Sequence, residues 1–260
     1  MAWTLKANTL ATPGSGGGTT SAIDTTGADL LIVGVSAYAD NTATNPTDSK
    51  GNSWTALTRS PVNDPSCRFF YALPGTVGTG HTFTWSSAGS YPVIMVLAFG
   101  GVGASPFDKE NGARGVTVSS LATGSVTPVE DGELLVSIWA GLETGTNPSC
   151  DNGFSLVDSV AFGNGNNCPG ASAYLVQATA AAINPTWSWT TASTAAAALA
   201  TFKVAAAVAN VPDRGTSRGL ARGIARGLAN ARTMVRDASG LLVPKDRRLV
   251  IPVGLDFQGA

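Results

Sequence analysis

The chain has 260 residues, of which only 13% are charged and 31 are glycine. Long runs rich in Leu, Glu, Lys and Arg are missing, which excludes a mainly helical domain. No uninterrupted stretch of 18 apolar residues occurs, and residues 1–10 lack a cationic start followed by a long apolar run. We therefore expect neither a membrane span nor a secretory signal peptide.

Charge divides the chain into two parts. The net charge is −1, but residues 1–205 sum to −6 and residues 206–260 to +5, because nine Lys and Arg face only four Asp and Glu in the second part. The sequence thus predicts a domain at 1–205, here called the head, and a basic extension at 206–260, here called the arm.

In chain order, the first clear strand is predicted at residues 29–38. This run is almost continuously apolar, which is typical of a central strand that is buried on both faces. A second strand at 81–86 alternates, with Phe83 and Trp85 on one face and hydroxyl side chains on the other, as in a half-buried strand. Gly, Pro, Asn and Asp clusters between the runs predict turns.

The same series returns about 100 residues later, which predicts an internal duplication with halves at about 1–103 and 104–205. Segments 21–38 and 125–142 align, and so do 51–57 with 151–157. We further match 81–87 with 185–191. Single residues pair as Cys67 with Cys168, Tyr71 with Tyr174, Trp54 with Phe154, and Phe99 with Phe202.

Four or five strands in each half give eight to ten strands, the number found in an antiparallel two-sheet sandwich of jelly-roll type. Each half exposes an apolar face that the other half can bury, so we predict one all-β domain.

The motifs of the head resemble those of a jelly-roll-like β-sandwich module that is common in phage virion proteins and bacterial surface proteins. They read ADLLIVGVSAY, GNSWTAL, FFYALPG, HTFTW and VIMVLAFGGV, the last followed by SPFD. The resemblance covers residues 1–205 and implies the fold and display on a particle or surface.

The arm contains a four-residue repeat, RGTS-RGLA-RGIA-RGLA. A short helix here would carry adjacent Arg and Gly stripes and would need a packing partner, because glycine destabilises an isolated helix. Two later apolar runs, 241–243 and 249–253, have the character of short strands that add to another chain. We predict partner docking by Arg214, Arg218, Arg222, Arg226, Gly219, Gly223, Leu249 and Ile251.

Other uses of the arm are less well supported. Nucleic-acid binding is disfavoured, since residues 214–253 hold no aromatic side chain for base stacking. A membrane-surface helix is disfavoured as well, because only Leu220, Ile224 and Leu228 would supply its apolar face. Docking to other proteins, with self-association through the Gly stripe, is the favoured interpretation.

Catalytic motifs are absent, so we predict no enzyme, cofactor or metal. His81 is the single histidine and is expected to be structural. Two acidic clusters, Asp108 with Glu110 and residues 130–133, could supply the carboxylates of a glycosidase. The second cluster is better explained as a solvated turn before a strand.

Cysteine and tryptophan leave alternatives open. Cys150 and Cys168 flank a Gly/Asn-rich segment and either close a loop as a disulfide or remain separate thiols, the second being favoured. The tryptophans of the repeated strands are expected to pack in the core, whereas Trp3 and Trp139 are less constrained.

We expect an accessory structural protein of a phage virion, made in the host cytoplasm, with the head displayed and the arm attached to capsid or tail proteins. Capsid decoration is slightly favoured over a tail or fibre component. The alternative is a glycan- or receptor-binding module of a tail fibre or bacterial adhesin.

Overall fold

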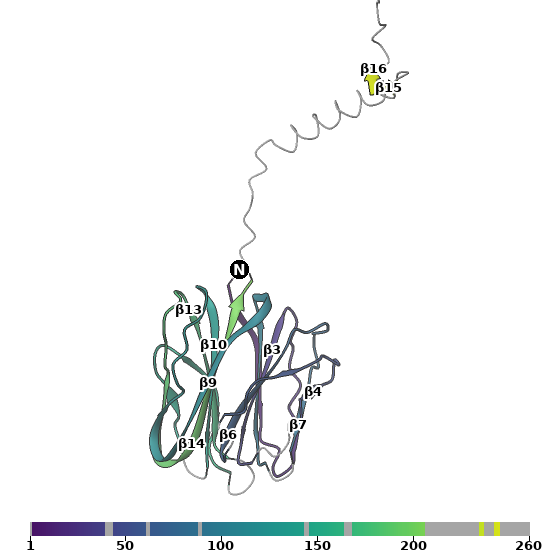
Figure 1. The fold of residues 1–260 in the computed structure, drawn as a ribbon. Helices are drawn as coiled ribbons and strands as arrows, with labels where there is room; N and C mark the ends of the chain where they lie inside the picture. Colours follow the sequence, from purple (N-terminus) through teal and green to yellow (C-terminus); the bar gives the residue numbers. More distant parts are fainter. Residues whose placement is uncertain are drawn as a thin grey trace, which may run out of the picture. The chain divides into compact units, whose positions relative to one another are not determined.

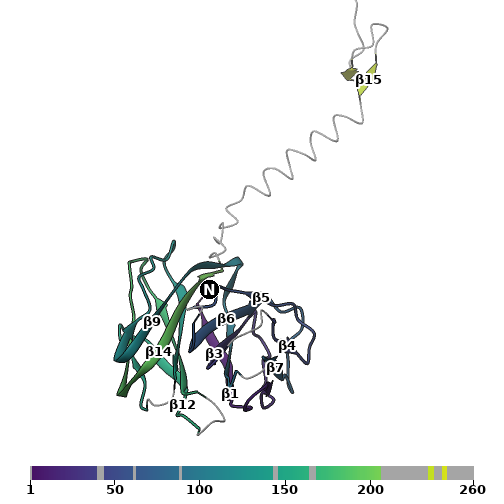
Figure 2. The same ribbon diagram turned by 60° about the horizontal axis from the view of Figure 1, so that its bottom comes forward.

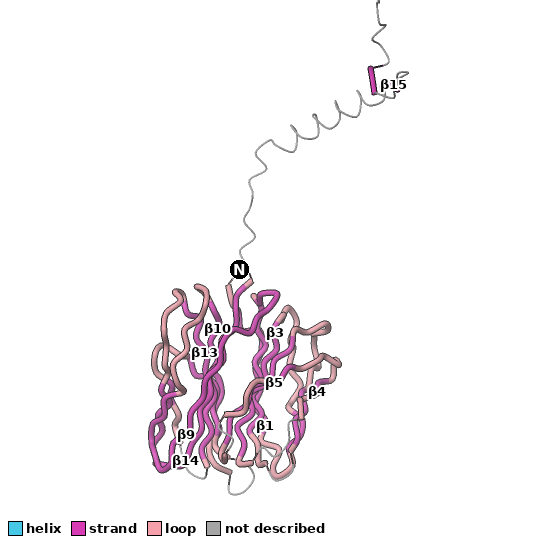
Figure 3. The backbone as a smooth tube through the Cα atoms, in the orientation of Figure 1, coloured by secondary structure: helices cyan, strands magenta, loops and turns pink. Residues whose placement is uncertain are grey.

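The structure is a computed structural model that describes residues 2–39, 44–60, 63–87, 90–142, 146–163 and 168–205, and the backbone of 234–236 and 242–244. All regular elements in these segments are strands, which confirms the predicted all-β sandwich (Figure 3). The predicted number of eight to ten strands is too low, because the described part of the head contains the fourteen strands β1 to β14. Duplication is visible as two similar halves that lie side by side (Figures 1 and 2).

The first half forms an inner sheet of order β1-β8-β3-β6-β5 and an outer sheet of order β2-β7-β4. Strands β3 and β8 are central because their apolar runs are buried at every position. The strands of the first half pair in nested order: the first with the last (β1/β8), the second with the last but one (β2/β7), and the third with the last but two (β3/β6). This is the strand order of a jelly roll. The bounds are Thr4–Ala11, Gly17–Thr19, Leu30–Ala37, Thr47–Asp48, Thr55–Ala56, Ser66–Ala72, Phe83–Ser86 and Val93–Gly100 for β1 to β8.

The second half repeats this order with six strands, because β9 and β14 are long enough to serve both layers. Its inner layer, β9-β14-β10-β13-β12, corresponds to β1-β8-β3-β6-β5. In register, Tyr174 takes the place of Tyr71 and Phe202 that of Phe99, as predicted. The bounds are Val102–Ala122, Glu133–Gly141, Ser149–Cys150, Ser155–Val160, Gly170–Gln177 and Thr186–Val204 for β9 to β14.

One predicted alignment is wrong by two residues. The isolated bridge formed by His81 is repeated in the second half by Ile183, not by Pro185, so Trp85 corresponds to Trp187. A shift of two residues keeps every side chain on its own face of a sheet. The alternating pattern is therefore the same in both registers and does not distinguish them.

Apolar side chains form three cores. The central core lies between the two inner sheets, and one further core lies between the inner and outer layers of each half. The inner sheets are therefore covered on both faces, which explains their continuous apolar runs. The central core includes Leu30, Ile32, Phe69, Met95, Leu97, Val136, Ile138 and Phe202.

The halves are joined along two seams that are related by an approximate two-fold axis. At the β1–β12 seam, the Asn8 amide donates to Asp158 Oδ2 over 2.8 Å. At the β9–β5 seam, Glu110 accepts the backbone N–H and the hydroxyl of Thr58 over 3.0 and 2.6 Å. Asn8 and Glu110 hold equivalent register positions on β1 and β9. Equivalent edges thus pair reciprocally, as in a symmetric dimer.

At one end of the head, Gly101 lies against three other segments of the chain. The Gly101 N–H donates to Asp29 over 3.1 Å, and its carbonyl accepts the N–H of Ala205 over 2.8 Å. Gly101 has a φ of 113°, and a Cβ there would lie 2.8 Å from the Ala2 carbonyl oxygen, so glycine is required. The link between the halves and the point at which the arm begins therefore lie together.

The chain divides into the units Met1–Ala207 and Val208–Ala260. In the second unit, β15 (Met234–Arg236) pairs antiparallel with β16 (Leu242–Pro244). The predicted strand at 241–243 thus appears as β16, but it pairs with a strand of its own arm, which the sequence analysis did not identify.

Candidate functional site

Among the described residues, two cavities at the β9–β5 seam bear on function. One, of about 450 Å³, lies between β5, β6 and the start of β9. The other, of about 320 Å³, is lined by Thr58, Phe69 and Glu110 among others. Because both oxygens of the Glu110 carboxylate already accept a hydrogen bond from Thr58, the larger cavity is the better candidate for binding. It is lined by Ser53, Thr55, Tyr71, Leu73, Ala104, Ser105, Pro106 and Phe107.

Both halves build the larger cavity, which is called the seam groove below. Thr55 and Tyr71 are cross-strand neighbours on β5 and β6, and Phe107 comes from β9. The Tyr71 and Phe107 rings are nearly parallel, with centroids 6.2 Å apart and 17° between their planes. Both rings also contact Phe202 of the central core edge to face, at 5.7 and 6.4 Å. The core therefore fixes the orientation of the aromatic wall.

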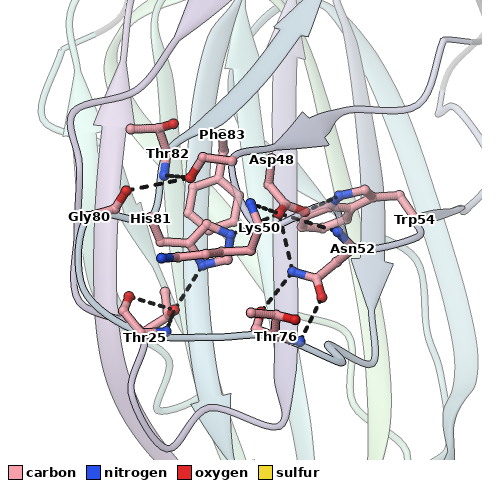
Figure 4. Close-up of polar contacts among 12 residues, drawn as sticks. Thr25, Asp48, Lys50, Asn52, Trp54, Thr76, Gly80, His81, Thr82 and Phe83 are labelled. Carbon is pink, nitrogen blue, oxygen red and sulfur yellow. Dashed lines mark hydrogen bonds and ion pairs between the residues drawn. The ribbon is translucent and has the colours of Figure 1, made fainter.

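A second polar arrangement surrounds His81, in the first half (Figure 4). The imidazole Nε2 lies 3.0 Å from Asp48 Oδ1 and Nδ1 lies 2.8 Å from the Thr25 hydroxyl, while the ring stacks on Phe83 at 4.3 Å. With Asp48 ionised, Nε2 carries the proton and donates, and Nδ1 accepts from Thr25. Asp48 also accepts the Trp54 indole N–H over 2.9 Å.

This hydroxyl–imidazole–carboxylate chain resembles a catalytic relay in its hydrogen bonds. The Thr25 and His81 residues and the Asp48 side chain, however, have no exposed surface, so a substrate cannot contact the hydroxyl. Burial raises the pKa of Asp48, but hydrogen bonds from His81, the Lys50 backbone and Trp54 outweigh it and hold that pKa below its ordinary value. These hydrogen bonds connect β4 and the loop before β3 to the segment at His81, which leads into β7.

Glu133 corrects the prediction for the acidic residues. It is fully buried at the start of β10 rather than solvated, and its Oε1 accepts the N–H of Val129 over 3.0 Å. Asp108 Oδ2 accepts from that same N–H, also over 3.0 Å. The two predicted clusters therefore meet, because β9 runs past the turn before β10. Asp108 has only 6% side-chain exposure, so the pair leaves no room for a sugar between its carboxylates.

The surroundings of Glu133 favour its neutral form. Burial raises its pKa and the nearby Asp108 carboxylate raises it further, against the lowering effects of the Thr201 hydroxyl and of the backbone N–H groups of Glu130 and Val129. Glu133 is therefore a structural residue whose contribution to stability depends on whether its carboxyl group is protonated.

The cysteines do not form the disulfide that the sequence left open. All three are free thiols, and the Cys168 Sγ lies 3.5 Å from the backbone oxygens of Ser36 and Tyr91. Burial raises the pKa of Cys150 and of Cys168 to about 12, so neither is a thiolate at neutral pH. Cys67 is not the repeat partner of Cys168, since Gly170 holds the position in β13 that Cys67 holds in β6.

All six tryptophans are buried, with at most 8% exposure. The predicted packing of Trp54, Trp85, Trp187 and Trp189 is confirmed, and Trp3 and Trp139 join the cores as well. Stacking of a ligand on the head must use other aromatic side chains. The candidates Tyr71 and Phe107 were not predicted from the sequence, because only the packing of β9 beside the first half brings their rings together.

The predicted docking residues of the arm lie outside the described residues: Arg214, Arg218, Arg222, Arg226, Gly219, Gly223, Leu249 and Ile251. The same holds for the predicted short helix and for the run at 249–253.

Comparison with protein-family models finds no match, and neither curated proteins nor solved structures match the chain. Within the described segments there is no helix with the length and apolar character to cross a membrane.

Proposed function

We propose that this chain is an accessory structural protein of a phage virion, with the head displayed on the particle and the arm attached to capsid or tail proteins. Capsid decoration is slightly favoured, because the globular part precedes the attachment segment. The phage assignment comes from the motif resemblance of residues 1–205. Self-association through the glycine repeat of the arm is part of the proposal.

The observation that carries the proposal is the meeting of three segments at Gly101. The arm begins at the end where the two halves are joined and where Ala2 lies, so attachment through the arm would leave the rest of the head available for display. The ionisable side chains of His81, Asp48 and Glu133 also support a structural role, because they are buried and hydrogen-bonded within the head.

The test is incorporation into particles. A chain that ends at Ala207 should keep the β-sheet circular-dichroism spectrum of the full chain but should no longer co-sediment with particles. The full-length variant Arg218→Gln/Arg222→Gln/Arg226→Gln is the matched control for charge, and it should be incorporated less than the unchanged chain. Normal incorporation of the chain that ends at Ala207 would contradict attachment by the arm.

A further inference from the structure

The seam groove has a lining of mixed chemistry without charge. None of its eight residues is ionisable near neutral pH, and together they offer an aromatic wall and four hydroxyl groups. The hydroxyls of Ser53, Thr55, Tyr71 and Ser105 form no hydrogen bond with any other described residue. A groove of about 450 Å³ falls in the size range of small-molecule sites.

This lining selects among ligand classes. An anionic ligand would lose hydration without meeting a cation, and a purely apolar ligand would leave the hydroxyls unpaired. A neutral sugar matches both features, because its C–H face can cover an aromatic ring while its hydroxyls exchange hydrogen bonds with Ser, Thr and Tyr. Both Tyr71 and Phe107 are partly exposed, so ring surface is available.

We propose that the seam groove binds a neutral sugar residue of a glycan, with Tyr71 and Phe107 as the stacking wall and Ser53, Thr55 and Ser105 as hydrogen-bonding partners. Binding is a property of the head and does not depend on where the arm attaches. It would give a displayed structural protein an affinity for a carbohydrate surface.

The approximate two-fold axis provides a control within the molecule. At the other seam, Leu5 pairs with Phe99 as Phe107 pairs with Phe202, and Tyr174 contacts Phe99 at 5.3 Å. Leucine thus replaces the outer aromatic ring at an otherwise similar position. The substitution Phe107→Leu reproduces a side chain that this fold already accommodates and removes half of the aromatic wall.

The experiment applies the full-length chain to an array of neutral glucose, galactose and mannose oligosaccharides, with sialylated and sulfated glycans alongside. We expect binding to at least one neutral glycan and none to the anionic ones. Phe107→Leu should weaken binding by about tenfold, which corresponds to about 1.4 kcal/mol. Thr55→Val, which removes one hydroxyl at nearly constant volume, should weaken it several-fold. The distant exposed aromatic variant Tyr38→Ala should bind as the unchanged chain does.

Two further readouts keep the test decisive. Urea unfolding checks that the Phe107→Leu and Thr55→Val proteins are folded, and backbone NMR titration with the bound oligosaccharide should shift Thr55, Tyr71 and residues 104–107. An array without neutral-glycan binding, affinity unchanged in both groove variants, or shifts confined to another surface would each overturn the proposal. Particle incorporation of Phe107→Leu should stay normal, which separates failure of the sugar site from failure of attachment by the arm.

Discussion

Asp48 has a structural role that a neutral side chain cannot fill. Its carboxylate accepts from His81, Trp54, Asn52 and the backbone of Lys50. Asp48→Asn replaces one acceptor oxygen by an NH₂ group that faces donors, so we expect the free energy of unfolding in urea to fall by about 1.5–3 kcal/mol at pH 7.

Asp24→Asn is the matched control, since that exposed carboxylate bonds only Thr26 among the residues with described side chains and its replacement should change stability little. Because the folded-state pKa of Asp48 is lowered, its stabilisation is present above the unfolded pKa and is lost as pH falls through the folded pKa. The deficit of Asp48→Asn should therefore shrink in acid. A deficit that is independent of pH would contradict the role of its charge.

Glu133 should give the opposite pH dependence. Its pKa is raised by burial, so its favourable contribution is present below the unfolded pKa and is lost as pH rises through the folded pKa. Glu133→Gln mimics the protonated form and keeps the oxygen that accepts from Val129. We expect this variant to unfold at higher urea than the unchanged protein at pH 7 and at the same urea near pH 4. A lower midpoint at pH 7 would show that the charged form stabilises the fold.

Sequence reasoning found these residues but not their surroundings. His81 was expected to be structural from its place on the face of Phe83 and Trp85, yet its partner Asp48 comes from β4, a two-residue strand that has no periodic signal. Glu133 was placed in a solvated turn, because the approach of Asp108 depends on the register of β9 against β14. Pairings between distant segments are not encoded in local patterns.

At the scale of the elements, the two inner sheets approach closely at Gly34 in the middle of β3. A Cβ at this position would lie 2.9 Å from Ile138 Cγ2 of β10. We expect Gly34→Ala to lower the free energy of unfolding by about 1–3 kcal/mol, as overpacking does. Gly75→Ala, where no atom lies within 4 Å of the new methyl group, is the control. Equal stability of both variants in urea would contradict direct packing of the inner sheets.

The elements that the sequence predicted are those with a strong pattern. Strands β3 and β10 were identified from apolar runs, and β7 from alternation. The lengths of β9 and β14 were missed for different reasons. Strand β14 begins with an alternating pattern and then becomes continuously buried, whereas β9 is almost entirely exposed or partly buried, so neither has one period along its length. Apolar runs showed that the inner strands are buried on both faces, but not that the sheets form four layers.

For the whole molecule, the central core makes each half depend on the other. Residues 1–103 alone would expose Leu30, Ile32, Phe69, Met95 and Leu97, an apolar face that a monomer does not leave uncovered. We expect this fragment to self-associate when expressed alone and to form a 1:1 complex when co-expressed with residues 104–207, as measured by light scattering after gel filtration. A folded, monomeric 1–103 fragment would contradict the shared core.

Attachment of the head to a virion through the arm is tested most directly by a cryo-electron microscopy map of virus particles that carry the full-length chain. We predict density for two adjoining jelly rolls on the particle surface, with residues 208–260 in contact with another capsid or tail protein. Absence of the chain from purified particles, or an arm that contacts no other virion protein, would contradict it.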